Sequence, residues 1–148
     1  MESPPSLSQS ISRVFRVLAR EGDAVLTPLG LRFAQIPVFV LLSPGTPMTQ
    51  KTLAEAAGIE QPSMAQLLAR MERDGLIEHA PHPTDARSRT ITLADPGDPR
   101  ISQGNRRLAE LQQRATVGLT DQQVQVLTQL LDQVRRNLER GAPDPEHR

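Results

Sequence analysis

The sequence predicts a mainly α-helical protein with a small β-wing, in which a winged helix-turn-helix is joined to a helical dimerisation region formed by the N- and C-terminal helices. Three observations lead to this fold class. A short helix, a glycine-containing turn and a second amphipathic helix follow one another in the middle of the chain. Two strand-like segments come directly afterwards. Helices with apolar stripes lie before and after this central part.

The composition limits the core and excludes several kinds of chemistry. The chain of 148 residues is long enough for one domain with helical extensions, and 17 Lys and Arg balance 17 Asp and Glu. Hydrophobic residues make up 37%, with three Phe and no Trp or Tyr, so association of two chains is an attractive way to bury apolar surface. The lack of cysteine excludes disulfides, thiol catalysis and Cys-ligated metals.

Neither a membrane span nor a signal peptide is expected. The longest apolar run, Ile36 to Leu42, is far too short to span a bilayer. Residues Met1 to Pro5 lack the basic and apolar regions of a signal peptide. We therefore expect a soluble, cytoplasmic protein with no membrane partner.

The N-terminal part is expected to form two helical segments. The first runs from about Ser8 to Pro28, where apolar residues recur at three- and four-residue spacing. The second covers Phe33 to Leu42 and has Pro37 near its first turns. We assign residues 1–30 and 98–148 to the dimerisation region and residues 31–97 to the winged helix-turn-helix.

The central helices have clear end signals. Thr49 is the expected cap of a short helix, Gln50 to Ala57, that closes at Gly58. After a tight turn, Pro62 suits the first position of a second helix that runs to about Arg73. This second helix is the predicted recognition helix.

Two strands and their connection form the predicted wing. Leu76 to Ala80 is the first strand, and Arg89 to Leu93 alternates polar with apolar residues as its partner. The connection from Pro81 to Ser88 is too long for a two-residue hairpin turn.

Two further helices are predicted at the C-terminal end. They cover Pro99 to about Thr116 and Asp121 to about Glu139, and Thr120 with Gln123 forms a capping box for the last one. Their apolar stripes pack either within one chain or between two chains. As the candidate dimer interface we select Ile11, Val14, Leu108, Leu111, Leu127, Leu131, Val134 and Leu138.

This arrangement predicts a protein that binds double-stranded DNA. The second helix of such a motif enters the major groove, and the wing reaches the backbone or the minor groove. Gln pairs with adenine edges, whereas Ser, Thr, Lys and Arg also contact phosphates. The candidate DNA-binding residues are Thr49, Lys51, Gln61, Ser63, Met64, Gln66, Arg70, Arg73, Asp85, Arg87 and Arg89.

The charge of the predicted DNA-binding segment is a counter-argument. Residues 48–93 hold five cations and six anions, a balance of 5 − 6 = −1. Specific binding then requires the cations to face DNA, and non-specific binding is expected to be weak. A winged helix that serves as a protein–protein interaction module, without specific DNA binding, is therefore the alternative.

No catalytic, cofactor or metal site is predicted. The sequence has no glycine-rich phosphate loop, no nucleophile elbow and no His-Glu-x-x-His motif, so an enzyme would need titratable groups that we cannot place. His79 and His82 with Asp85 suggest a metal site only weakly, because their spacing is not one of the specific zinc patterns.

From about Ser8 to Glu139, the chain resembles the multiple antibiotic resistance regulator (MarR) family. The motifs that carry the resemblance are Thr49 with Leu53-Ala54, Gln61-Pro62-Ser63, the run Arg70 to Glu78, Pro83-Thr84-Asp85-Ala86-Arg87, and Leu119-Thr120 followed by Gln123. The resemblance implies a homodimer on a pseudo-palindromic operator, usually a repressor, which small and often phenolic or anionic ligands release from DNA. It also implies that Arg87 enters the minor groove while Asp85 orients it, and that Ser63, Gln66 and Arg70 contact DNA from the recognition helix.

A ligand pocket is expected by analogy alone. We place it between the first helix, the second helix and the start of the fifth. Candidate lining residues are Phe15, Phe39 and Val40, with Arg13 or Arg16 facing an anionic group.

Overall fold

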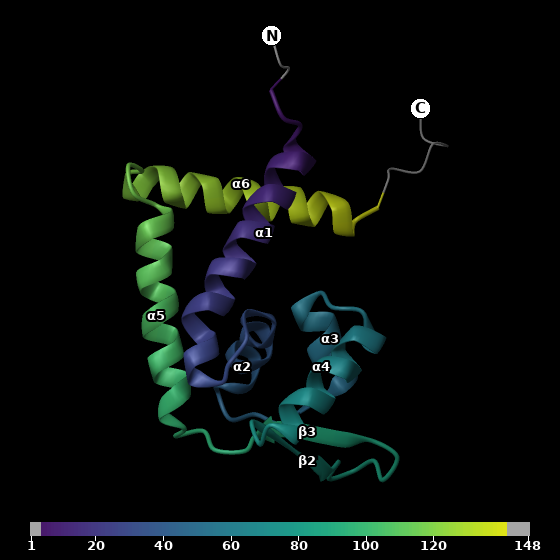
Figure 1. The fold of residues 1–148 in the computed structure, drawn as a ribbon. Helices are drawn as coiled ribbons and strands as arrows, with labels where there is room; N and C mark the ends of the chain where they lie inside the picture. Colours follow the sequence, from purple (N-terminus) through teal and green to yellow (C-terminus); the bar gives the residue numbers. More distant parts are fainter. Residues whose placement is uncertain (1–3, 142–148) are drawn as a thin grey trace, which may run out of the picture. The chain divides into compact units, whose positions relative to one another are not determined.

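The computed structural model describes residues 4–141 and has the predicted fold class (Figure 1). Six α-helices and two 3-10 turns accompany a small antiparallel sheet in this part of the chain. In order, the elements are α1 (Leu7–Leu26), η1 (Thr27–Leu29), η2 (Phe33–Gln35), α2 (Ile36–Leu42), β1 (Met48–Thr49), α3 (Gln50–Ala57), α4 (Gln61–Arg73), β2 (Ile77–Pro81), β3 (Arg89–Leu93), α5 (Pro99–Ala115) and α6 (Asp121–Glu139). The chain divides into two compact units, Met1–Leu111 and Gln112–Arg148.

The helix ends follow their capping signals. Ser6 caps α1 in a capping box with Gln9, so the helix begins one residue before the predicted start. It ends at Leu26, where Pro28 and the left-handed Gly30 (φ 73°) convert the last predicted turn into η1. Within residues 4–141, no single helix is long and apolar enough to cross a membrane. Two segments taken together, Leu7–Leu29 and Phe33–Leu42, have the length and composition of a span, but they are bent by 92° relative to each other.

The helix-turn-helix consists of α3 and α4. The hydroxyl of Thr49 accepts a hydrogen bond from the backbone N–H of Thr52 at 3.2 Å, and Gly58 ends α3 in the left-handed region (φ 66°). Helix α4 begins at Gln61, one residue earlier than predicted. Pro62 is therefore the second residue of α4 and not the first. Proline is accepted at both positions, because the backbone N–H groups of the first two helical residues have no acceptor within the helix.

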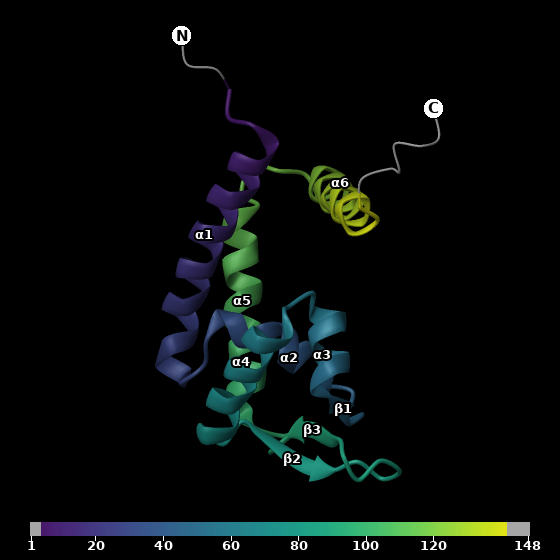
Figure 2. The ribbon, with the colours of Figure 1, turned by 90° about the vertical axis from the view of Figure 1, so that its right-hand side faces the viewer.

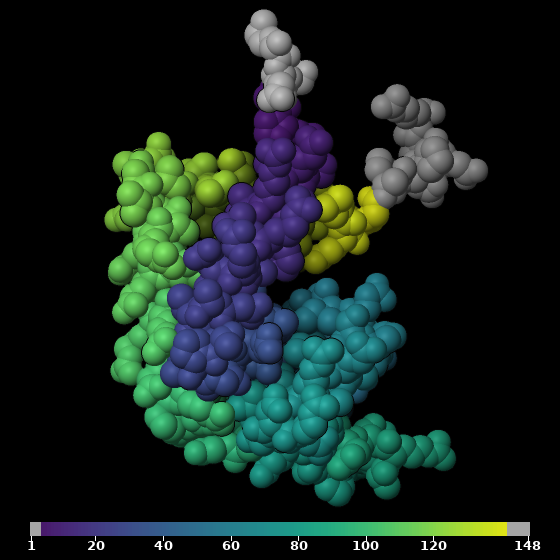
Figure 3. Space-filling model, viewed as in Figure 1, coloured from purple at the N-terminus to yellow at the C-terminus, as the bar shows by residue number. Residues whose placement is uncertain are grey.

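The sheet has three strands, in the order β1-β3-β2 (Figure 2). Ile77 pairs with Leu93 and Pro81 with Arg89 in the predicted wing. The third strand, β1, was not predicted; it pairs Thr49 with Thr90. The loop between β2 and β3 projects beyond the rest of the Met1–Leu111 unit in the space-filling view (Figure 3).

One apolar core holds the Met1–Leu111 unit together. Its fully buried side chains come from α1, α2, α3, α4, β2 and β3, and include Leu26, Leu53, Leu68 and Ile91. Ala54 is buried in α3, whereas Ala56 is exposed.

Helix α1 approaches the core closely at Gly22. A Cβ atom built on Gly22 would lie 2.9 Å from Cγ of Phe33 and closer still to Cδ2. The backbone N–H of Phe33 also donates to Asp23 Oδ1 at 2.8 Å. The Phe33 ring therefore packs directly on the backbone of α1.

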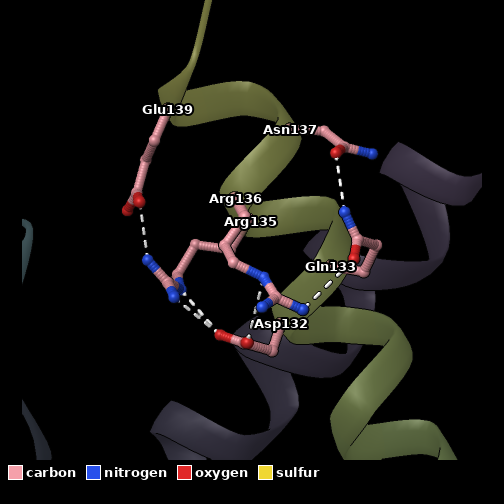
Figure 4. A network of polar contacts seen from close by, with 6 residues as sticks. All are labelled: Asp132, Gln133, Arg135, Arg136, Asn137 and Glu139. Atoms are coloured by element: carbon pink, nitrogen blue, oxygen red, sulfur yellow. Dashed lines mark hydrogen bonds and ion pairs between the residues drawn. The ribbon is translucent and has the colours of Figure 1, made fainter.

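In the Gln112–Arg148 unit, α6 has the predicted capping box between Thr120 and Gln123. A polar network follows its exposed surface over the last turns (Figure 4). Arg135 binds Asp132 at 2.7 Å and Glu139 at 2.6 Å, and Arg136 lies 3.4 Å from Asp132. The hydrogen bond from Arg135 lowers the pKa of Asp132.

Candidate nucleic-acid interface

Helix α4 has a buried apolar side and an exposed polar side. Met64, Leu68 and Met71 face the core at i, i+4, i+7 spacing and are almost completely shielded from solvent. The prediction that Met64 contacts DNA is therefore wrong, because its side chain is fully buried. The same spacing in the sequence is the signal that could have placed it in the core.

The exposed side of α4 carries the polar side chains expected of a DNA-reading surface. Gln61, Ser63, Gln66 and Arg70 are all exposed along it, and Arg73 is exposed at its C-terminal end. Within residues 4–141, the guanidinium groups of Arg70 and Arg73 make no ion pair. Both cations are free to meet an external anion.

Two further candidate DNA-binding residues, Thr49 and Lys51, lie at the start of α3. Lys51 is exposed in the first turn, and the preceding Thr49 is half-buried. Because the Thr49 hydroxyl accepts the capping hydrogen bond from Thr52 N–H, its structural role is to start this helix. Lys51 is the better placed of the two for a phosphate.

Side chains at the base of the wing loop fix its conformation. His82 Nδ1 accepts hydrogen bonds from the backbone N–H groups of Thr84 at 3.2 Å and Asp85 at 3.1 Å. Asp85 Oδ1 accepts from the backbone N–H of Arg87 at 3.0 Å, and Oδ2 accepts from the Ser88 hydroxyl at 3.2 Å. Asp85 therefore holds the backbone at Arg87, whereas the resemblance to the MarR family predicts that it orients the side chain of this arginine.

The wing arginines are available for contacts. Arg87 and Arg89 are exposed, and no ion pair with another residue of the 4–141 range engages either guanidinium. Arg87 lies in the loop and Arg89 opens β3. The wing therefore presents two exposed cations.

The two wing histidines serve different contacts. His79 Nδ1 is buried 3.2 Å from Glu72 Oε2, in a geometry that makes no hydrogen bond, while His82 orders the loop. Among residues 4–141, no cluster of three or more His, Asp or Glu side chains is arranged to hold a metal ion.

A pocket of about 620 Å³ lies against α4. Its walls come from α1, η2, α2, the end of α3 with the turn that follows it, and α4, whereas α5 contributes none of the lining residues. The lining residues are Phe15, Phe33, Ala34, Ile36, Pro37, Ala57, Gly58, Ile59, Ser63, Gln66, Leu67 and Arg70.

Of the five residues predicted for a ligand site, only Phe15 lines this pocket. Phe39 is buried in the core and Val40 is exposed elsewhere on α2, because α2 turns Phe39 inward beside Val38 and Leu42. Arg13 and Arg16 line a separate, shallow polar depression on α1. Phe33 and the α4 side chains were missed, because no local pattern joins segments so distant in sequence.

The predicted dimer-interface residues fall into two groups. Ile11 and Val14 on α1 and Leu127, Leu131 and Leu138 on α6 are exposed, Leu138 by 77%, and Val134 is half-buried. On α5, Leu111 is only 6% exposed and belongs to the core of the protomer, so its assignment to the interface is wrong. Leu108 packs against the core but is half-buried, and its place in the interface stays a prediction.

Comparison with known proteins identifies the same arrangement. Residues 29–88 match the sequence model of the MarR family. A cysteine-to-serine mutant of E. coli MarR, complexed with operator DNA, is 26% identical, with a TM-score of 0.79 over 86% of this chain and 92% of that one. The repressor CouR, bound to a 23-mer DNA duplex, is 24% identical, with a TM-score of 0.80 over 88% of this chain and 92% of that one. M. tuberculosis MosR, in complex with DNA, is 24% identical, with a TM-score of 0.75 over 90% and 98% of the two chains.

The fold and the polar surface of α4 and the wing define a winged-helix transcriptional regulator. The matched segment runs from η1 through the whole helix-turn-helix into the wing loop. The match to the MarR family model covers residues 29–88, and the similarity to a solved MarR structure extends over 86% of this chain.

Proposed function

We propose that the chain is a homodimeric repressor that binds a pseudo-palindromic operator in double-stranded DNA and is released from it by a small organic ligand. One observation carries the proposal: the outer side of α4 presents Ser63, Gln66 and Arg70, while its inner side is anchored in the core. A recognition helix must combine these two properties to present fixed side chains to base edges.

The two parts of the surface take different roles in this proposal. Ser63 and Gln66 read base edges in the major groove, and Arg70 contacts a base or a phosphate. Arg87 enters the minor groove from a loop that Asp85 and its hydrogen bonds keep ordered. Lys51 and Arg89 neutralise phosphates on either side.

The homodimer is supported by unpartnered apolar side chains. Val14 and Phe15 on α1 and Leu130 and Leu138 on α6 are each 60% exposed or more. A second copy that covers such surface would hold two recognition helices about 34 Å apart, the distance between successive major grooves.

The test begins with selection of duplexes from a random pool on the purified protein, followed by fluorescence anisotropy with the selected duplex. Arg87→Ala should weaken binding by about tenfold and make it less dependent on salt concentration, because one cation is lost from the interface with DNA. Arg20→Ala on α1 is the matched control, because Arg20 is exposed and lies outside the proposed interface; its affinity should equal that of the unaltered protein.

A protein–protein module without specific DNA binding is the second candidate, because residues 48–93 carry one net negative charge. The selection separates the two candidates. Enrichment of one sequence motif supports the repressor. A pool that stays random at low salt, where electrostatic binding is strongest, rejects DNA recognition and supports the module.

A further inference from the structure

Helix α5 is fastened to the C-terminal end of α1 by one long-range hydrogen bond. The guanidinium Nη1 of Arg107 donates to the backbone carbonyl of Val25 at 3.2 Å, across 82 positions of the sequence. Val25 is one of the last four residues of α1, whose carbonyls have no donor within the helix. Pro28, three residues later, has no N–H to supply. A cation at this end also interacts favourably with the helix dipole, so Arg107 caps α1 from another helix.

Close packing holds the two helices together next to this bond. Gly104 is buried on α5, one turn before Arg107. A Cβ atom built on Gly104 would lie 3.2 Å from side-chain atoms of both Leu26 and Leu31, and Ile101 of the same helix packs against the core. The C-terminal end of α1 therefore lies directly against the first half of α5 (Figure 1).

The first half of α5 is also tied to the wing. Directly after β3, the backbone N–H of Ala94 donates to the carbonyl of Leu76 at 3.1 Å. Just before α5, the carboxylate of Asp98 accepts hydrogen bonds from the guanidinium of Arg100 at 3.0 and 2.7 Å. These contacts fix where α5 starts. The helix thus joins the wing, at its start, to α1, at Arg107.

We propose that Arg107 is a positioning residue that fixes the spacing between the two half-sites that the protein reads in DNA. The inference rests on the proposed function, because it requires two copies joined through exposed apolar side chains such as Val14 of α1. The hydrogen bond to Val25 holds α1 at one angle to the DNA-reading surface of its own chain. In a dimer, that angle decides how far apart the two recognition helices lie.

Helix α1 is long enough for a small change of angle to matter. It has 20 residues and is therefore about 30 Å long. A tilt of about 6° at one end moves the other end by about 3 Å, close to the rise of one base pair, about 3.4 Å. A loosened joint should therefore let the protein accept half-sites that are one base pair too close or too far apart.

Spacing is tested by fluorescence anisotropy with the duplex selected from the random pool and two derivatives that have one base pair added or removed between the half-sites. The measured quantity is the ratio of the Kd for altered spacing to the Kd for the selected spacing. Arg107→Met keeps a long side chain but cannot donate, and it should reduce this ratio by about three- to tenfold, the effect of one hydrogen bond. Arg107→Lys keeps a donor and the charge, and it should preserve most of the ratio.

Arg106→Met is the matched control. Arg106 is the adjacent residue of α5, it is exposed, and it forms no ion pair with another residue of the 4–141 range. This variant should leave the ratio unchanged. Equal ratios in Arg107→Met and the unaltered protein would overturn the positioning role, and so would an equal reduction in Arg106→Met.

A duplex with a single half-site reports on the reading surface alone. Arg107→Met should bind it like the unaltered protein, because the lost hydrogen bond joins α5 to α1 and involves neither α4 nor the wing. Weaker binding to this duplex would mean that Arg107 supports the fold of the reading surface, and it would reject the positioning role.

The same measurements separate this inference from the proposed function. If selection enriches two half-sites and Arg107→Met leaves the ratio unchanged, the proposed function stands and the positioning role fails. A pool in which no paired half-sites are enriched rejects both, because no spacing is then read.

Discussion

The contact between Gly22 and Phe33 gives a sharp test of how α1 joins the core. The perturbation is Gly22→Ala, which adds one methyl group to the interior of α1. Its Cβ would lie 2.9 Å from Cγ and 3.1 Å from Cε2 of Phe33, too close for either atom to stay in place. The ring or the helix must therefore move.

The expected magnitude combines two opposing effects. Alanine is more favourable than glycine inside a helix by about 1 kcal/mol. Overpacking of this kind costs about 1–3 kcal/mol. With Phe33 present, we expect Gly22→Ala to lower the free energy of unfolding by about 1 kcal/mol. With the ring removed by Phe33→Ala, only the helix effect remains, and the same change should stabilise by about 1 kcal/mol.

The assay is urea unfolding of the four proteins of the double-mutant cycle, at one protein concentration because the proposed dimer would contribute to stability. Helix content by circular dichroism reports the transition. The predicted result is a change of sign for Gly22→Ala between the two backgrounds, with a coupling energy of about 2 kcal/mol. An effect of the same sign and size in both backgrounds would refute the steric contact with Phe33.

Three further predictions concern other contacts. Hydrogen bonds from Arg100 lower the pKa of Asp98, so the ionised carboxylate stabilises the fold at any pH above the pKa that Asp98 has in the unfolded chain. Asp98→Asn should therefore lower the free energy of unfolding by about 0.5–1 kcal/mol at pH 7, and urea titrations should show this difference decreasing as the pH falls below 4. His82→Ala should expose the amides of Thr84 and Asp85 to hydrogen exchange and weaken DNA binding, whereas His82→Asn, whose side-chain oxygen can accept the same bonds, should preserve both. Leu131→Arg should shift the sedimentation coefficient from dimer to monomer, and Gln125→Arg, also exposed on α6, should not; equal behaviour of the two would remove α6 from the interface.

Local signals in the sequence placed most of the elements. The bounds of α3 follow from Thr49 and Gly58, and the start of α6 follows from the Thr120 capping box, since each signal lies within a few residues of the feature that it predicts. The wing strand β3 was predicted from alternation and agrees residue for residue. The combination of these elements then predicts a winged helix.

Features that depend on distant segments were not predicted. Strand β1 has two residues and exists only because it pairs with β3. The pocket joins Phe15 to Arg70, and no periodicity connects them. The orientation of Met64 is a different case, because its spacing to Leu68 and Met71 is a local signal in the sequence that places it on the buried side of the helix.

One short strand links the wing to the helix-turn-helix. Thr49 pairs with Thr90 of the wing and, through its hydroxyl, also starts α3. The buried side chains of β2 and β3 also share one core with α3 and α4. The wing and the helices should therefore settle onto a duplex as one rigid body.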